Sequence, residues 1–531
     1  MNQNSLVTPE AQIGVTSYLA DVNEGPSFDQ IPFRVEAEER PDLDSFVVVE
    51  RAGEDDVLHY GRIGAGLEQN PESDAATQQA ADAYNIDVGN VRPGDHDPKV
   101  VRVMFIELLG ELVFDGSEMT TRQPQSLPQT GQGVYVIEGS NLPELLNLPT
   151  ATEGPSGFQI GEIRSGGQSA PFALSRETIA RHIAILGRTG VGKTHTAHVL
   201  IEELVEAGVP VVSFDVLNDA EPMAEALGGQ TVQPGQDLSI PYSLIGFEAF
   251  EEFVSYTDAQ RELAQTAYEE VHAEALEQLR DEGEVDIPYK NLYDEIEDYG
   301  SNVGSNATDR AIQRTRWGLR LSPLGSQMDD WGRLLIENPL LNIDIGALGE
   351  SERQLVIGAV GRMLQQLRRR DEVPPFVLVV DEAHKYVPSA AERSPAGRVM
   401  RDFVQTARHD AIGTVLITQS PSTLDDVALR TANTHIVLAL DSDEMTAVRG
   451  LFGDVSKDTL DRIPKLEKGR AMIASARDLM RHTVPVDVRD RRTPEGAETP
   501  DLVSLASEWK DEYREQADAG VQDQLGAFDN S

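Results

Sequence analysis

Apolar positions follow a strand-like pattern in the first part of the chain. Short apolar runs at 46–49, 57–60 and 101–108 alternate with polar segments. The polar turn 53–56 separates the first two runs, which is a hairpin signal. Short strands joined by glycine-containing turns are typical of small barrels. We therefore predict a small N-terminal β-barrel over residues 1–150.

Beyond residue 173, apolar runs of strand length alternate with segments of helical period. The continuous apolar run 183–186 precedes helical periodicity over 194–207, and Gly208 is a suitable residue to end that helix. Further runs that read as strands lie at 209–214, 376–380, 414–418 and 435–440. Strands alternating with helices indicate an α/β core with a mainly parallel sheet. We place this core at 173–490.

Three segments do not fit either pattern. Residues 151–172 include a Gly- and Ser-rich stretch and are expected to link the barrel to the core. The segment at about 240–335 is strongly helical in pattern and acidic, so it is expected to be a helical insertion in the core. Residues 491–531 are expected to form an acidic C-terminal tail, with one amphipathic stretch at 502–513 that could dock.

The charge of the chain is its unusual bulk property. The 531 residues carry 45 Lys and Arg against 90 Asp and Glu, a formal net charge of −45, yet the hydrophobic fraction is 40%. That apolar content is organised into strands and helices, which argues against general disorder. At molar salt the Debye length falls to about 3 Å and carboxylate repulsion is screened, so we expect a salt-adapted, haloarchaeal protein.

Several classes of protein are excluded or disfavoured. The chain has no cysteine, so disulfides, thiolate metal sites and thiol catalysis are excluded. No apolar run approaches the roughly 18 residues of a membrane helix, and the first ten residues lack the features of a signal peptide. We therefore expect a cytoplasmic protein with no membrane partner.

The most specific motif follows the apolar run 183–186. It matches the P-loop pattern G-x-x-x-x-G-K-[ST] and comprises Gly187, Arg188, Thr189, Gly190, Val191, Gly192, Lys193 and Thr194. Its glycines let backbone N–H groups surround phosphate oxygens at the N-terminus of the next helix. Lys193 can reach the β- and γ-phosphates, and the Thr194 hydroxyl can coordinate Mg²⁺. The sequence therefore predicts ATP and Mg²⁺ as the ligands of this loop.

A second constellation follows the apolar run 376–380. Asp381 comes at the strand end, where it can hold the Mg²⁺ shell, and Glu382 can polarise the attacking water as general base. His384 either couples hydrolysis to movement or satisfies a turn, and the residues alone leave both open. Gln419 closes the strand at 414–418, where it could sense the γ-phosphate, because parallel strands end at the ligand crevice.

In their order, these motifs resemble the HerA family within the HerA–FtsK branch of RecA-like motors. The resemblance includes residues 132–135 and 142–148 at the end of the first domain, residues 181–187, the acids at 381–382, residues 418–424, and the closing strands near 466–473 and 484–486. It implies an α/β, RecA-like P-loop domain with a helical insertion, preceded by a small N-terminal β-barrel. It also implies a hexameric ring with ATP sites between subunits.

The resemblance further suggests roles for two arginines. Arg408 lies eleven residues before Gln419, where the family offers an arginine to the ATP of the neighbouring subunit. There it would neutralise charge on the phosphates. Arg181 occupies the position of a family arginine just before the P-loop strand. A surface arginine is the alternative for both residues.

The function implied is ATP-dependent translocation on duplex DNA, with a NurA-like nuclease as partner. Ser420 departs from the arginine of the family's T-Q-R-P segment, which puts the physiological task in doubt. A regulatory or defence-complex ATPase and a coupling ATPase of a transfer system are the alternatives. No basic stripe stands out. Candidate DNA contacts are Lys385, Arg393 and Arg398 after the acids, with a solvated loop as the alternative for each. Arginines also cluster at 314, 316 and 320 in one expected helix and at 368–370, where they can serve as cations at the end of another helix.

Overall fold

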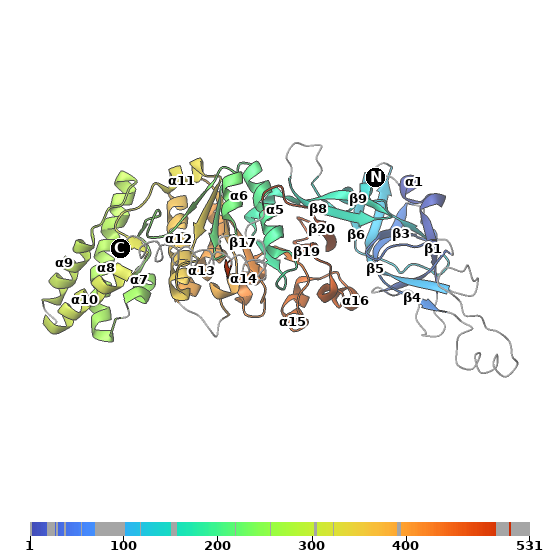
Figure 1. Ribbon diagram of the computed structural model, residues 1–531. Coiled ribbons are helices and arrows are strands. Elements are labelled where there is room, and N and C mark those ends of the chain that lie inside the picture. The colour runs from blue at the N-terminus through green and yellow to red at the C-terminus, as the bar shows by residue number, and fades with distance from the viewer. Residues whose placement is uncertain are drawn as a thin grey trace, which may run out of the picture.

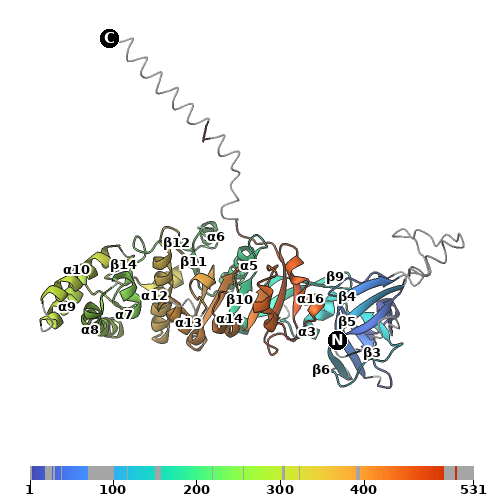
Figure 2. The same cartoon turned by 90° about the horizontal axis from the view of Figure 1, so that it is seen from below.

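Figure 1 shows the computed structural model as three parts in a row, and Figure 2 shows the same order from below. A β-barrel lies at one end, an α/β sheet in the centre, and a helical bundle at the other end. The structure describes residues 3–17, 27, 30–36, 39–54, 56–69, 101–116, 118–149, 157–217, 219–254, 256–301, 305–321, 323–389, 395–494 and 509–510.

Seven strands build the N-terminal barrel. They are β1 (Gln12–Thr16), β2 (Ile31–Val35), β3 (Phe46–Glu50), β4 (Val57–Gln69), β5 (Val101–Asp115), β6 (Glu118–Arg122) and β7 (Gly133–Val136). Their order is β2-β1-β7-β3-β4-β5-β6, and a further pairing of β2 with β5 closes the barrel. The expected hairpin is β3–β4, with Val48 opposite Tyr60. Two short helices, α1 (Gln3–Leu6) and α3 (Leu142–Leu146), complete this region.

An eleven-stranded sheet forms the centre of the molecule, in the order β12-β15-β11-β16-β17-β10-β18-β19-β20-β8-β9. The strands are β8 (Gly157–Ser165), β9 (Gln168–Ser175), β10 (Ile183–Leu186), β11 (Val211–Asp215), β12 (Gln230–Val232), β15 (Leu340–Asp344), β16 (Phe376–Val380), β17 (Ile412–Thr418), β18 (Thr434–Val437), β19 (Arg470–Ser475) and β20 (Val484–Val488). The pairings from β12 to β18 are parallel, and those from β18 to β9 are antiparallel.

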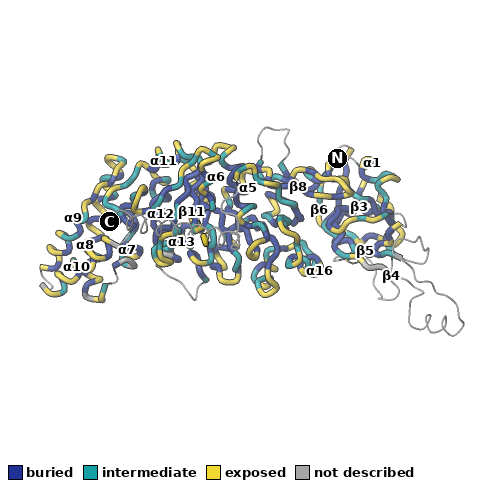
Figure 3. The backbone as a smooth tube through the Cα atoms, viewed as in Figure 1, coloured by how far each residue is buried: buried dark blue, intermediate teal, exposed yellow. Residues whose placement is uncertain are grey.

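Helices cover both faces of the parallel part, as its continuous apolar strands require. In β10, Ala184 and Leu186 belong to one core cluster, and Ile183 and Ile185 belong to another. Figure 3 shows the central strands as buried. The covering and connecting helices are α4 (Arg176–Ala180), α5 (Lys193–Glu206), α6 (Glu221–Ala226), α12 (Glu350–Arg369), α13 (Pro395–Thr406), α14 (Asp426–Thr431), α15 (Met445–Val448) and α16 (Lys457–Leu460).

The segment at about 240–335 is helical. It contains α7 (Phe247–Val254), α8 (Asp258–Glu282), α9 (Tyr289–Gly300), α10 (Ser305–Leu321) and α11 (Trp331–Glu337). A two-stranded sheet of β13 (Ile240–Pro241) and β14 (Leu324–Gly325) joins its two ends. Within the residues that the structure describes, no helix combines the length and apolar character of a membrane span.

The expected linker at 151–172 is wrong as a description of residues 157–172. These residues belong to the hairpin β8–β9, and β8 pairs with β20 to extend the central sheet. Inward positions such as Phe158, Ile160 and Ile163 are buried, so the segment has the alternating pattern of a strand. The Gly and Ser content concealed this pattern. The sheet of the core therefore begins at Gly157 and not at residue 173.

The first residues of the expected acidic tail are basic and docked. Arg492 contacts Glu206 of α5 at 2.5 Å, and the Thr493 hydroxyl donates to Glu202 at 2.7 Å. Arg491 contacts His198 of the same helix at 2.9 Å. Residues 491–493 therefore belong to the core, whereas the amphipathic stretch 502–513 lies outside the described residues except for 509–510.

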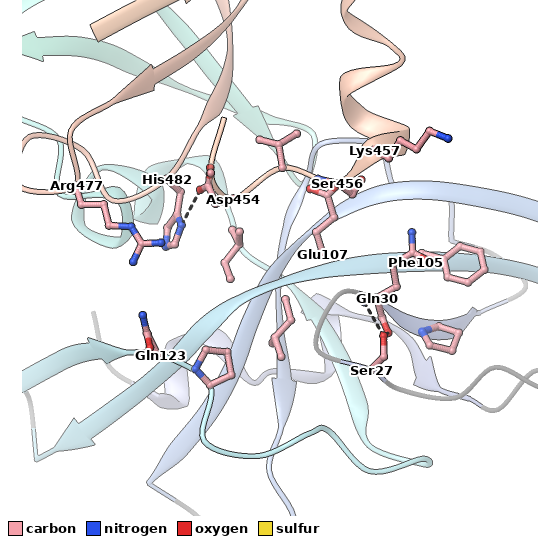
Figure 4. A pocket seen from close by; sticks show the side chains of 16 residues that line it. Ser27, Gln30, Phe105, Glu107, Gln123, Asp454, Ser456, Lys457, Arg477 and His482 are labelled. Carbon is pink, nitrogen blue, oxygen red and sulfur yellow. Dashed lines mark hydrogen bonds and ion pairs between the residues drawn. The ribbon is translucent and has the colours of Figure 1, made fainter. Parts of the chain in front are cut away.

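Polar contacts lock the barrel to the core. Arg62 of β4 is fully buried and donates to Glu107 of β5 at 2.6 Å and to the carbonyl of Thr483 at 2.7 Å. Glu107 in turn accepts from the Thr459 hydroxyl at 2.6 Å. Glu107 also lines a groove of about 990 Å³, and Figure 4 shows it there together with the contact between His482 and Asp454. The buried pair on β4 and β5 therefore bonds directly to residues 459 and 483 of the core.

Candidate active site

Four parallel strands end at the same edge of the sheet, and the candidate residues gather there. Leu186 of β10 pairs with Thr418 of β17, so the P-loop begins beside the end of β17. On the other side of β17, Val380 of β16 pairs with Leu416, which brings Asp381 and Glu382 to this edge. The carboxyl ends of parallel strands form the ligand crevice of such sheets.

Backbone hydrogen bonds hold the P-loop between β17 and β18. The Gly187 N–H donates to the carbonyl of Thr418 at 3.2 Å, and the Arg188 N–H donates to that of Ala439 at 2.8 Å. Gly190 and Gly192 have φ values of +82° and +109°, which residues with a Cβ atom rarely adopt. The loop then enters α5 at Lys193, so the N-terminus of that helix faces the loop.

Lys193 is held inside the loop. Its side chain is 8% exposed, and its Nζ donates to the carbonyl of Arg188 at 3.1 Å. Burial lowers the pKa of Lys193, whereas the carboxylates of Glu382 and Asp381 oppose that shift. The ammonium group therefore lies against the P-loop and near the acids at the end of β16. From there it can bind nucleotide phosphates.

Asp381 and Glu382 occupy different environments although they are neighbours. Burial raises the pKa of Asp381 to about 6, and the nearby Glu382 and Asp215 carboxylates add to that effect. Glu382 has a φ of +50°, a conformation that non-glycine residues rarely adopt and that is concentrated at functional sites. Among the described residues, its buried Oε2 atom has no hydrogen-bond partner. That atom can accept a proton from an attacking water.

The donor set fits Mg²⁺. Thr194, Asp381 and Glu382 line one cavity of about 130 Å³ together with Asp215. Carboxylates crowded in a buried place favour a divalent cation, which would replace the missing positive charge. Thr194 and Asp381 would hold the ion, with nucleotide phosphates and water as its remaining ligands. Among the described residues, no group of three or more His, Asp or Glu side chains is arranged to hold a metal ion by itself.

A chain of contacts joins the two sides of the site. His384 Nδ1 is 3.0 Å from the Thr418 hydroxyl and 3.3 Å from Glu382 Oε2. The next residue of β17's end, Gln419, accepts from the Thr189 hydroxyl of the P-loop at 2.6 Å. The end of β17, which lies between β16 and β10, is therefore linked to Glu382 through His384 and to the P-loop through Gln419.

Arg408 and Arg181 lie at the amino ends of the parallel strands, on the side of the sheet opposite to the P-loop and the acids. Arg408 is in the 3-10 turn Ala407–Asp410, directly before β17, and is exposed. The seven residues of β17 separate it from the P-loop by roughly 20 Å. Arg181 precedes β10 and contacts Asp478 at 2.5 Å and Glu177 at 3.4 Å. The structure therefore brings neither arginine to the P-loop of its own chain.

Sequence reasoning missed Asp215 as part of the site. It ends β11, lines the cavity beside Asp381, and accepts backbone N–H groups of Leu217 and Ala220 at 3.0 and 2.8 Å. A carboxylate directly after an apolar strand was visible in the sequence. Its proximity to Asp381 depends on the pairing of β11 with β16.

Of the candidate DNA contacts after the acids, the structure describes the side chain of Lys385 alone. Lys385 lines the same cavity as Asp381 and Glu382, which places it at the nucleotide site. Arg393 lies outside the described residues, and the side chain of Arg398, in α13, is likewise not described.

Residues 158–364 match the family model of the HerA helicase central domain. The chain is 22% identical over 438 residues to a probable helicase of Methanocaldococcus jannaschii, covering 77% of this chain and 80% of that protein. It is 23% identical over 425 residues to the DNA double-strand break repair helicase HerA of Pyrococcus furiosus, covering 70% and 75%. The VirB4 structure of Thermoanaerobacter pseudethanolicus aligns with a TM-score of 0.48 and 15% identity, covering 65% of this chain and 99% of that one.

The P-loop, the strand-end acids and the sequence relatives agree. The chain is a HerA-like ATPase that uses ATP and Mg²⁺. At the site, Lys193 is buried under the P-loop, and Asp381 and Glu382 line one cavity with Thr194. These are the groups that a phosphate clamp, a cation ligand and a general base would require.

Proposed function

We propose that this HerA-like ATPase is a motor that moves along duplex DNA as a ring of six identical subunits. ATP would bind at the P-loop of one subunit, and the neighbouring subunit would complete the site with Arg408. In such a ring, hydrolysis at one interface changes how two subunits meet. Loops that face the channel would convert that change into movement of the duplex.

The observation that supports a ring is the location of Arg408. Its own P-loop lies at the opposite edge of the sheet, roughly 20 Å away across β17. An arginine that stabilises the charge of the transferring phosphate has to approach it closely. Arg408 can therefore serve ATP only in another subunit. The proposals of six copies and of site-forming interfaces rest on the family resemblance.

The proposal of DNA as the track rests on the relatives. Several proteins that the chain resembles are named DNA double-strand break repair helicase HerA. A NurA-like nuclease is proposed as the partner on the same resemblance, with DNA end processing as the task. The site contains the P-loop lysine, the acid for the cation and the general base, which supports active turnover over a scaffold without hydrolysis.

We also infer that the motor works at molar salt. With a formal net charge of −45, the carboxylates of this chain would repel one another strongly in dilute buffer. At 1 M salt the Debye length is about 3 Å, so most of that repulsion is screened. Phosphate contacts weaken by roughly the 0.9 power of salt for each phosphate neutralised. Enclosing the duplex in a ring would retain it under those conditions without a broad basic surface.

The deciding experiment measures ATP hydrolysis with and without duplex DNA, from dilute buffer to molar KCl. We expect duplex DNA to raise the rate several-fold, with the highest rates in molar KCl. Lys193→Ala protein is the control for contaminating ATPases. If duplex DNA of any length, in any salt, leaves the rate unchanged even with a partner nuclease added, the motor proposal fails. A regulatory ATPase would then be the better description.

A further inference from the structure

Helix α10 of the bundle presents a polar face that differs from its surroundings. Ala311, Thr315 and Leu319 are buried and pack it onto the bundle. The opposite face carries Arg310, Gln313, Arg314 and Trp317, all exposed. Residues 310, 314 and 317 are separated by four and three positions, so they lie in one row about 10 Å long.

The row is basic within an acidic bundle. Helix α10 carries four arginines and one acid, Asp309, whereas α8 carries eight carboxylates and two arginines. One of the four, Arg316, lies over the ring of Tyr293 at 4.9 Å and so faces the bundle. Arg310 and Arg314 remain beside Trp317 on the outer face.

Trp317 is 70% exposed. This is unusual, because the large apolar surface of a tryptophan side chain makes its exposure to water unfavourable. It lines a hollow of about 420 Å³ between α10 and the end of α7. The hollow is lined by Val254, Arg310, Gln313, Arg314, Trp317 and Gly318. Its lining combines an aromatic ring, two guanidinium groups and an amide, and among the side chains that the structure describes it includes no carboxylate. We name this set of residues the Trp317 groove.

We propose that the Trp317 groove binds single-stranded nucleic acid, with a base stacked on Trp317 and backbone phosphates beside Arg310 and Arg314. Single-strand sites combine these two elements, because every base has a flat face and every nucleotide has a charged phosphate. Its use by the motor, to hold a strand separated at a DNA end, rests on the proposed function.

The chemistry of the groove favours nucleic acid over an acidic protein segment. The carboxylates of an acidic peptide would use the arginines, but they supply no flat ring to cover Trp317, whereas every nucleotide carries a base beside its phosphate. Ion pairs alone also weaken as salt rises, whereas base stacking is not an ionic contact. A site that pairs stacking with two phosphate contacts therefore retains affinity in the salt that the charge of this chain suggests.

The test measures binding of a labelled single-stranded oligothymidylate to the full chain by fluorescence anisotropy, over a series of KCl concentrations. Trp317→Ala should weaken binding roughly 5- to 150-fold, the range expected for loss of one stacked base. Trp509→Ala is the matched control, because Trp509 is also exposed, at 63%, and lies outside the groove. Replacing Arg310 and Arg314 by Gln should reduce the salt slope by about 0.7 for each phosphate that is no longer neutralised.

Two results would overturn the proposal. Equal affinities of the Trp317→Ala and Trp509→Ala variants would show that no base stacks on Trp317. Equally strong competition by poly-glutamate of the same charge would identify the groove as a site for acidic protein. Fluorescence of the buried Trp331 checks the fold of each variant.

The outcome is separable from the motor proposal. Duplex-stimulated hydrolysis without Trp317-dependent oligothymidylate binding would contradict this inference alone. Trp317-dependent binding without any duplex stimulation would contradict the motor and leave the groove as a nucleic-acid site.

Discussion

At the scale of single residues, Lys193 and Glu382 divide the chemistry between binding and hydrolysis. Lys193 is nearly buried under the P-loop, and the carboxylates of Glu382 and Asp381 raise its pKa against the lowering effect of burial. Glu382 presents a buried Oε2 atom that has no hydrogen-bond partner among the described residues. In the proposed mechanism, the first group would contact the phosphates and the second would act on the attacking water.

We expect Lys193→Ala to abolish ATP turnover, because the phosphate clamp loses its charge. Glu382→Gln should still bind ATP but hydrolyse it at least about a hundredfold more slowly, the lower range for losing a general base. Steady-state hydrolysis and fluorescent-nucleotide binding measure the two effects. Glu337→Gln, an exposed acid on α11, is the control. Near-normal turnover in either site variant would refute the assignment of these residues.

His384 contacts both the general base and β17. Its Nδ1 lies 3.0 Å from the Thr418 hydroxyl and 3.3 Å from Glu382 Oε2. The Thr418 hydroxyl also accepts from the N–H of Ser420 at 3.1 Å, so the same atom orders the turn that follows Gln419. From these contacts we propose that His384 positions Glu382, and the alternative is that it only satisfies a turn.

His384→Ala should lower kcat about tenfold while leaving KM for ATP nearly unchanged. The substitution removes the ring beside Glu382 and its hydrogen bond to Thr418, and the loss of one hydrogen bond corresponds to about that factor. His384→Asn should recover part of kcat, because its side-chain amide can occupy the position of Nδ1. Steady-state kinetics over a range of ATP concentrations separate kcat from KM. A loss of thermal stability with kcat retained would instead assign His384 to the turn.

At the scale of elements, the joint between barrel and core is a polar network. The Tyr60 hydroxyl of β4 lies 2.7 Å from His482 Nε2, and His482 Nδ1 contacts Asp454 at 3.0 Å. Burial would raise the pKa of Asp454, but hydrogen bonds from His482 and Thr483 outweigh it and hold the pKa at about 2. The carboxylate form of Asp454 is therefore what the joint requires.

This pKa predicts how the joint depends on pH. A carboxylate with a lowered pKa stabilises the fold above its unfolded value near 4, and the effect is lost as pH falls through about 2. We expect Asp454→Asn to reduce the free energy of unfolding by about 2 kcal/mol at neutral pH. The difference from wild type should shrink in acid. Urea unfolding in molar salt at several pH values measures it.

Asp461→Asn is the control for the Asp454 experiment, because Asp461 also pairs with a basic side chain, Arg449, but is about half exposed. Its substitution should change stability little at any pH. If Asp454→Asn behaved like this control at neutral pH, the barrel–core network would contribute no stability through that carboxylate.

At the scale of the whole molecule, the P-loop and Arg408, which would meet in the proposed catalytic interface, lie at opposite ends of the strands of one sheet. The P-loop follows β10 and Arg408 precedes β17, and these two strands are parallel neighbours. Because parallel strands point the same way, a residue before one and a loop after the other are separated by the strand length. Association of subunits edge to edge would bring them together.

Mixing two inactive proteins tests this arrangement. Arg408→Ala and Lys193→Ala should each be inactive alone, yet mixed rings should recover part of the ATPase where an intact P-loop meets an intact Arg408. Native mass measurements in high salt establish ring size and subunit exchange. No recovery despite exchange, or a monomer under these conditions, would count against action between subunits.

Local chemistry could be predicted from the sequence because its residues are contiguous. The P-loop, the acids after an apolar strand and the helix that begins at Lys193 each depend on neighbours within a few positions. The same holds for the hairpin β3–β4, whose alternating strands flank a polar turn. The hairpin β8–β9 was missed because its Gly and Ser content suggested a linker, although its inward positions are apolar.

By itself, the sequence determined an α/β chain with a P-loop and with two acids directly after an apolar strand, because backbone conformation and strand ends follow from local pattern. Only the tertiary structure decided which strand ends are neighbours. The insertion of β17 between β16 and β10 brings Gln419 to Thr189 and His384 to Thr418, and the pairing of β11 with β16 adds Asp215. It also sets Arg408 a strand's length from its own P-loop. These contacts join residues far apart in sequence, whose proximity depends on the packing of the whole sheet.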